Sequence, residues 1–172
     1  MDILKKNFFE IFGLPVSINI DLVRLEKSYT SLQKEFHPDK FSNSSDYEKR
    51  LALQISSYLN DGYSVLKNII TRIEYILRIE NKEADENKTL QDSNFLIEQL
   101  ELNDTIESLK HDNKNNSEID MIRKNIIEKM DILIESIEQG YSKSNYESVW
   151  VNLSKYKFYN NHLHQIEGLQ SK

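Results

Sequence analysis

LVRLEKSYTSLQKEFHPDKF, residues 22–41, combines one long amphipathic pattern with an abrupt stop. Its apolar side chains recur at steps of three and four residues, and at about 100° per residue they fall in a single stripe. We expect this stripe to be core; it consists of Leu22, Leu25, Tyr29, Leu32 and Phe36. Pro38 disfavours helical geometry at His37, so the stretch predicts a helix over about 21–36.

The face opposite this stripe is basic and carries Arg24, Lys27 and Lys34. Most charged outer faces are merely solvated, so the lysines alone would indicate little. From about residue 46, however, a second amphipathic pattern runs back, and two long helices joined by a short loop pack antiparallel. The core side of this return helix is formed by Leu51, Ile55, Tyr58, Leu59, Tyr63 and Leu66. The tip of the hairpin then consists of His37, Pro38, Asp39 and Lys40, a stiff polar turn typical of a protein contact.

The rest of the chain divides at a polar stretch without periodicity, which predicts a linker over 81–93 between units 1–80 and 94–172. A third apolar pattern precedes it, near 69–77. Beyond it we expect a three-helix bundle, with Gly140 as a C-cap; its helices span about 94–109, 117–138 and 145–168. The predicted fold class is all-α.

Composition narrows the function. The 172 residues include no cysteine, which fits a reducing compartment and leaves no thiolate ligand or nucleophile. The formal charge of -6 falls wholly on residues 81–172, and an acidic half argues against nucleic-acid binding. No apolar run approaches the ~20 residues that span a bilayer. We therefore expect a cytoplasmic protein without membrane or nucleic-acid partners, and without a metal or cofactor.

One face of the predicted helix 94–109 does not belong to the core. Its core stripe consists of Phe95, Leu102, Ile106 and Leu109, whereas a second apolar cluster, Leu96, Ile97 and Leu100, is centred about 150° away. Acidic side chains flank this cluster, among them Glu101 and Asp104. On the last helix, Phe158 also points away from the predicted core. Either another element covers these residues, or they form a docking surface for a protein partner.

Four segments spread over the chain resemble the HscB family, the J-domain co-chaperones of iron–sulfur cluster assembly. They are FFEIFGLP at 8–15, LQKEFHPDKF at 32–41, RIEYIL at 72–77 and NFLIEQLEL at 94–102. The resemblance implies a J-domain helical hairpin followed by a C-terminal three-helix domain. It implies no catalytic residue and no enzyme, but a protein that stimulates the ATPase of a DnaK-type chaperone of the HscA kind and delivers an IscU-type scaffold to it.

The resemblance assigns residues to both partners. The chaperone-binding set would be His37, Pro38, Asp39, Arg24, Lys27, Lys34 and Lys40. The scaffold-binding set would be Leu96, Ile97, Leu100, Glu101, Asp104 and Phe158. Two departures concern the hairpin: Gly62 stands where the family usually has Ala and should loosen the helix by up to about 1 kcal/mol. Asn68-Ile69-Ile70 lacks the usual Pro, so we expect a less sharply specified turn.

Two other functions remain as alternatives. The C-terminal domain could hold unfolded clients for a general DnaK-type chaperone, which would require a broader apolar surface than one rimmed cluster. His37 and Asp39 could instead form a catalytic or metal pair, but residues around a proline do not readily converge on one ion. The histidines at 162 and 164 point apart on a helix, so they are poor co-ligands as well.

Overall fold

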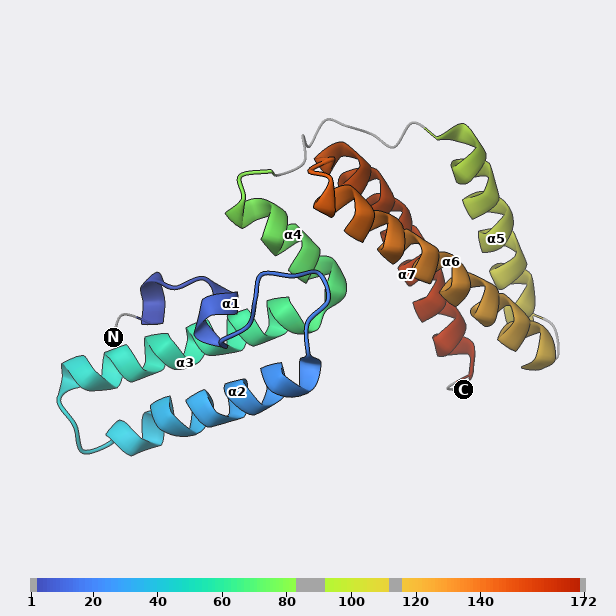
Figure 1. Ribbon diagram of the computed structural model, residues 1–172. Coiled ribbons are helices and arrows are strands. Elements are labelled where there is room, and N and C mark those ends of the chain that lie inside the picture. Colours follow the sequence, from blue (N-terminus) through green and yellow to red (C-terminus); the bar gives the residue numbers. More distant parts are fainter. Residues whose placement is uncertain (1–2, 83–91, 112–115, 171–172) are drawn as a thin grey trace. The chain divides into compact units, whose positions relative to one another are not determined.

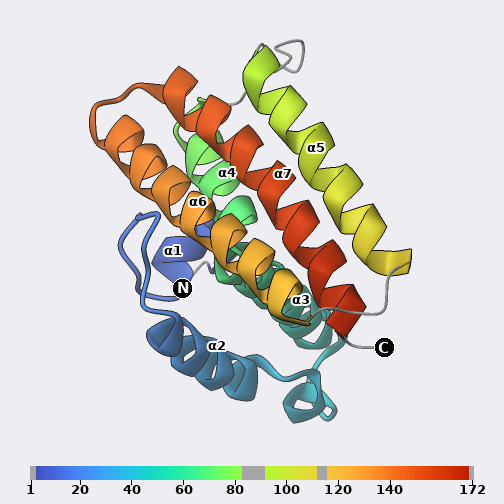
Figure 2. The ribbon, with the colours of Figure 1, turned by 90° about the vertical axis from the view of Figure 1, so that its right-hand side faces the viewer.

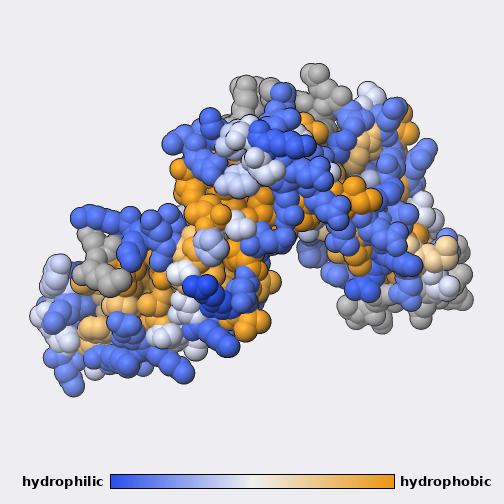
Figure 3. All heavy atoms as spheres, viewed as in Figure 1, coloured by the Kyte–Doolittle hydropathy of each residue, from blue (hydrophilic) through white to orange (hydrophobic). Residues whose placement is uncertain are grey.

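The computed structural model describes residues 3–82, 92–111 and 116–170, and the chain forms two compact units, residues 1–83 and 84–172. Within the described ranges every regular element is a helix (Figure 1). The predicted linker falls largely on residues 83–91, which lie outside the described residues. Polar side chains cover most of the visible surface of each unit, with hydrophobic residues between them (Figure 3).

The N-terminal unit is built around an antiparallel pair of helices, α2 and α3, as the hairpin pattern predicted (Figure 1). A short 3-10 turn joins them at the tip, and two short segments and a fourth helix pack against α3. In chain order the elements are η1 (Ile3–Lys5), α1 (Phe8–Ile11), α2 (Leu22–Phe36), η2 (Pro38–Phe41), α3 (Asp46–Lys67) and α4 (Ile69–Ile79).

Side-chain caps fix where these helices begin. The Asp21 carboxylate accepts hydrogen bonds from the backbone N–H groups of Val23 and Arg24, at 2.9 and 3.0 Å, and starts α2. Ser45 and Glu48 form a reciprocal capping box at the start of α3. Such caps satisfy the donors that the first helical turn leaves open, and each typically contributes about 1 kcal/mol.

The core of this unit is apolar and aromatic, and it corrects one prediction. Leu25 is fully buried, but Leu22, which the periodicity also placed in the core stripe, is 49% exposed. Leu22 is the first residue of α2, where the helix does not yet pack against α3. Other fully buried side chains of the unit are Phe9, Phe12, Leu59, Leu66, Ile73, Ile76 and Leu77.

The corner between α3 and α4 is more sharply specified than we expected from its missing proline. Asn68 ends α3 and also caps α4, because its Oδ1 accepts from the N–H groups of Ile70 and Thr71 at 2.9 and 3.3 Å. The Thr71 hydroxyl donates back to the carbonyl of Val65 at 2.8 Å. An asparagine at a cap thus replaces the geometric constraint that a proline would supply.

The C-terminal unit consists of α5 (Ser93–His111), α6 (Asn116–Ser142) and α7 (Tyr146–Gln170), and α7 lies between the other two (Figure 2). Isoleucines dominate its core: Ile106, Ile119, Ile126, Ile137 and Ile166 are fully buried. The only tryptophan of the chain, Trp150, is on α7.

The predicted C-cap at Gly140 is wrong, because α6 continues to Ser142. The residue with a left-handed backbone is Ser144, with φ of 54°. Around it, the N–H of Asn145 donates to the carbonyl of Gly140 at 2.8 Å, and the N–H of Ser144 donates to that of Tyr141 at 2.9 Å. These two bonds form a Schellman motif, in which Gly140 supplies a carbonyl and Ser144 adopts the left-handed conformation.

Candidate functional sites

The first candidate site is the turn at the tip of the N-terminal hairpin. His37 ends α2 in extended geometry, with ψ of 129°, and Pro38 is the first residue of η2. The N–H of Lys40 donates to the His37 carbonyl at 3.0 Å, and the N–H of Asp39 donates to the imidazole Nδ1 at 3.3 Å. His37 therefore closes the turn with both its backbone and its ring.

This closure leaves the Asp39 carboxylate free to meet a partner. Its side chain is 90% exposed, against 54% for His37. One Asp39 oxygen lies 3.6 Å from the His37 Nδ1, but a nitrogen that accepts a hydrogen bond carries no proton to donate. The turn thus presents a negative charge on a backbone that Pro38 and three local hydrogen bonds hold in place; the third runs from the Ser42 N–H to the Asp39 carbonyl.

The basic residues predicted to support this turn are all exposed, but they are not equivalent. Lys27 and Lys34 lie seven residues apart on the outer side of α2, and Lys40 lies in the turn itself. Arg24 instead donates from Nη2 to the carbonyl of Gly13 at 2.5 Å, and Gly13 has a left-handed φ of 64°. Arg24 therefore also fastens the segment before α2, a role that the sequence did not reveal.

A polar and aromatic contact between α2 and α3 fixes the position of the turn. The Asn60 Oδ1 accepts from the Tyr29 hydroxyl at 2.9 Å and from the Gln33 amide at 2.5 Å. The Tyr29 and Tyr63 rings stack with centroids 4.1 Å apart. Gln33 also exchanges hydrogen bonds with Ser56, at 3.2 Å each. These contacts set the register of the two helices, so they set where His37 and Asp39 stand.

Arg72 is a second residue whose role the sequence did not show. It is 4% exposed, and its guanidinium donates to the carbonyls of Leu66 and Ile18 at 2.6 Å each and to that of Lys67 at 3.2 Å. Burial lowers the pKa of Arg72, yet an arginine stays protonated in proteins. The cation thus satisfies carbonyls at the C-terminal end of α3, where the helix dipole favours positive charge. Its place in RIEYIL, one of the segments that carry the family resemblance, was the only available signal.

The second candidate site is an apolar surface on α5 and α7, which we call the α5 patch: Leu96, Ile97, Leu100 and Phe158. Their exposed fractions are 37%, 54%, 66% and 39%, so Ile97 and Leu100 are mostly open to solvent and Leu96 and Phe158 partly so. Phe158 joins the α5 residues through Phe95, since the two rings meet edge to face with centroids 5.7 Å apart. Glu101 and Asp104, which the sequence placed on the rim, are exposed as well.

The sequence analysis overlooked one exposed apolar residue on the same side of α7 as Phe158. Val151 is 39% exposed and lies seven residues before Phe158, two helical turns along the same side of α7. The seven-residue spacing was a usable signal, but a valine in a helix rich in apolar residues does not stand out as a solvent-exposed position.

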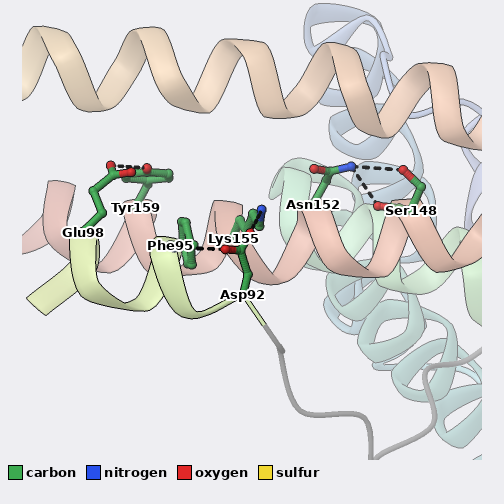
Figure 4. A network of polar contacts seen from close by, with 7 residues as sticks. All are labelled: Asp92, Phe95, Glu98, Ser148, Asn152, Lys155 and Tyr159. Atoms are coloured by element: carbon green, nitrogen blue, oxygen red, sulfur yellow. Dashed lines mark hydrogen bonds and ion pairs between the residues drawn. The ribbon is translucent and has the colours of Figure 1, made fainter.

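Polar contacts attach α5 to its neighbours (Figure 4). The Lys155 ammonium lies 2.6 Å from the Asp92 carboxylate, and the Glu98 carboxylate accepts from Lys129 at 2.5 Å and from the Tyr159 hydroxyl at 2.7 Å. Burial alone would raise the pKa of Glu98, but the hydrogen bonds from Lys129 and Tyr159 together with the positive charges of Lys129 and Lys155 outweigh it and lower the pKa. Burial, together with the bond to Glu98, raises the pKa of the Tyr159 hydroxyl above its ordinary value.

The described residues contain no cluster of three or more histidine or acidic side chains that could hold a metal ion. His37 and Asp39 stand alone at the tip of the hairpin, and His162 and His164 belong to the C-terminal unit. In the described part of the chain, no helix has the length and hydrophobicity needed to cross a lipid bilayer.

An antiparallel hairpin with an exposed His-Pro-Asp turn, followed by a helical bundle, defines a J-domain protein. Comparison with known proteins narrows the class. Residues 91–167 match the family model described as the HSCB C-terminal oligomerisation domain. The chain is 35% identical to the co-chaperone HscB homolog of Colwellia psychrerythraea, over 89% of this chain and 90% of that protein.

Two further relatives agree with this result. The co-chaperone HscB homolog of Vibrio vulnificus is 34% identical over 96% of this chain and 98% of its own length. The solved structure of the chaperone HscB from Vibrio cholerae superposes with a TM-score of 0.86 at 26% identity, covering 96% of this chain and 98% of that one. The chain belongs to the HscB family of J-domain co-chaperones. It is therefore not itself an enzyme.

Proposed function

We propose that this protein is a cytoplasmic adaptor of iron–sulfur cluster assembly. Through its hairpin it stimulates the ATPase of a dedicated DnaK-type chaperone of the HscA kind. Through the α5 patch it binds an IscU-type scaffold and delivers it to that chaperone, which aids the maturation of iron–sulfur proteins. One observation carries the proposal. The N-terminal unit of this family member exposes the turn with Asp39, and its C-terminal unit exposes an apolar patch with acidic side chains beside it.

The action on the chaperone must be one of binding, because the chain contains no GxxxxGK[ST] loop to cradle a nucleotide. Lys27, Lys34 and Lys40 would steer the hairpin toward an acidic surface. Asp39 would then pair with a cationic or polar group of the chaperone. A ligand shifts a conformational equilibrium only if it binds one state more tightly than the other. Asp39 must therefore bind the chaperone more tightly in the state that hydrolyses ATP than in the state that does not.

The α5 patch suits a folded partner with an apolar surface of its own. Each apolar side chain that becomes buried there contributes up to about 1.5–3 kcal/mol. Glu101 and Asp104 favour a partner with basic residues around its apolar contact. Because the patch and the hairpin belong to one chain, a bound scaffold is held near the chaperone at a raised effective concentration, so modest affinities suffice.

The test is the steady-state ATPase rate of the chaperone with this protein and the scaffold, added separately and together. We expect each alone to stimulate moderately and the two together to stimulate by more than the sum of their effects. The double variant Leu96→Ala, Phe158→Ala should keep the direct stimulation by the hairpin but lose scaffold binding and the extra effect. A control is Ile132→Ala, since Ile132 is an exposed apolar residue on α6 outside the α5 patch.

Two results would contradict the proposal. One is full synergy with the double variant, which would place the scaffold contact elsewhere. The other is suppression of aggregation of several unrelated denatured proteins by the native chain, lost in the double variant. That result would favour the alternative of a general carrier of unfolded clients.

A further inference from the structure

The apolar residues of α5 do not by themselves determine which side of the helix is buried. Measured from Phe95 at about 100° per residue, Leu102, Ile106 and Leu109 lie within about 40° of it, whereas Leu96, Leu100 and Ile97 lie about 100° to 200° away. Four apolar side chains thus face α7 and three face outward. In the first two turns of α5, a rotation of the helix about its own axis would replace Phe95 by Leu96, Ile97 and Leu100 against α7, whereas further along it would expose the buried Ile106 and Leu109.

The polar residues of α5 break this near-symmetry, because they occur on the inward side. Asp92, which immediately precedes α5, and Glu98 within it lie about 60° to either side of Phe95, so they bracket the buried face. Gln99 lies between them and is only 5% exposed. In a helix that buried its most hydrophobic side, these three positions would be apolar and Leu96, Ile97 and Leu100 would be polar.

Each bracketing carboxylate is engaged by a cation from a different neighbouring helix. Asp92 pairs with Lys155 of α7, and Glu98 pairs with Lys129 of α6 while it accepts from Tyr159 of α7. Asp92 also caps α5, since its Oδ1 accepts from the Phe95 N–H at 3.0 Å. Two attachments on opposite borders of one face oppose rotation of the helix in either direction, which a single attachment could not do.

We propose that Lys155 and Lys129, acting through Asp92 and Glu98, are positioning residues that hold α5 in the one rotation that keeps Leu96, Ile97 and Leu100 outside. Their effect on partner binding rests on the proposed function, but their effect on the helix does not. Without the two ammonium groups, the carboxylates turn toward water and the patch takes their place against α7.

The absence of cysteine from the chain provides a direct test. A single cysteine introduced as Leu100→Cys reports the outward side of α5, and one introduced as Gln99→Cys reports the inward side. The rate of reaction of each thiol with a disulfide reagent is measured in two backgrounds, native and Lys129→Met, Lys155→Met. Methionine keeps most of the length of lysine and removes its charge, and the sequence of α5 is untouched apart from the probe.

We expect the double variant to slow the reaction of Cys at position 100 several-fold and to speed that of Cys at position 99, with unchanged helical circular dichroism. The matched control is Lys124→Met, because Lys124 pairs with Glu128 within its own helix α6 and should change neither rate. Unchanged rates in the double variant would overturn the proposal. Fast reaction at both positions would overturn it too, since α5 would then have detached rather than rotated.

Scaffold binding by the double variant, measured without the cysteine probes, separates this inference from the proposed function. If the two thiol reaction rates exchange and scaffold binding is lost, both the positioning role of the lysines and the proposed function are supported. If the rates exchange while binding persists, the lysines position α5 but the α5 patch is not the scaffold site. If the rates stay unchanged while Leu96→Ala, Phe158→Ala still abolishes binding, the positioning role fails and the proposed function stands.

Discussion

The turn at the tip of the N-terminal hairpin and the α5 patch are both exposed, but they are built in opposite ways. The turn places one carboxylate, that of Asp39, on a backbone closed by Pro38 and His37. The patch distributes four apolar side chains over two regular helices. A contact made by one charged group is lost as a whole when that group is changed, whereas a contact shared among several apolar groups is lost in steps. The predictions below test this difference.

The largest effect should follow from Asp39→Asn. The variant keeps the size of the side chain but removes its charge, and a hydrogen bond to a charged group contributes about 1.5–3 kcal/mol. We expect ATPase stimulation to fall by about 10- to 100-fold, with thermal stability and scaffold binding unchanged. Asp61→Asn removes an exposed carboxylate from α3 and should have no effect. Retained stimulation by Asp39→Asn would show that the turn acts by shape rather than charge.

A smaller effect is expected from single substitutions in the α5 patch. Leu100→Ala should weaken scaffold binding about tenfold, because it removes part of one buried side chain from a shared contact. Titration calorimetry measures this loss. Leu96→Ala and Phe158→Ala should each give losses of the same order, and their effects should accumulate. A complete loss of binding from Leu100→Ala alone, with the fold intact, would show that the patch also depends on one dominant residue.

Glycine-to-alanine substitutions should change the stability of the two units in opposite directions. A Cβ at Gly62 would lie 2.7 Å from the Phe8 ring, which packs against Tyr58 and Tyr75. Gly62→Ala should therefore destabilise the N-terminal unit by about 1 kcal/mol, although helix propensity alone favours alanine. Gly168→Ala on α7 meets no atom within 4 Å and should stabilise by a similar amount. Urea unfolding of each variant measures both changes, and stabilisation by Gly62→Ala would show that Phe8 moves freely.

The smallest effect is a pH dependence confined to the C-terminal unit. Burial lowers the pKa of His162 below its ordinary value of 6.5, so the unfolded chain binds the proton more readily than the folded one. The resulting stability is fully present above pH 6.5 and is lost as the pH falls below it. His162→Leu should flatten the dependence between pH 7 and 5. An unchanged slope in His162→Leu would assign the effect to other groups.

The sequence predicted what depends on periodicity and on local chemistry. The helical hairpin and the turn at His37 follow from residue spacing and from one proline. The misassigned residues lie at helix ends. Leu22 has the spacing of a core residue, but it lies at the start of α2, where it does not pack against α3. Gly140 was predicted to cap α6, whereas Ser144 adopts the left-handed backbone conformation.

What the sequence could not provide is the identity of polar partners across helices. Arg72 donates to the carbonyls of Leu66 and Ile18, which lie six and 54 residues away in the sequence. No local sequence pattern predicts such a contact. The pairing of Gln33 with Ser56 has the same character. The departure at Gly62 was interpreted as a loss of helix propensity, because the ring that occupies the vacant Cβ position comes from α1.

The single tryptophan on α7 makes the two units optically distinguishable. Trp150 is the only indole of the chain, so fluorescence excited at its absorption edge comes from the C-terminal unit alone. Binding of a partner to the C-terminal unit can therefore be followed by indole fluorescence without a dye, whereas the tyrosines, which occur in both units, do not report on either unit alone.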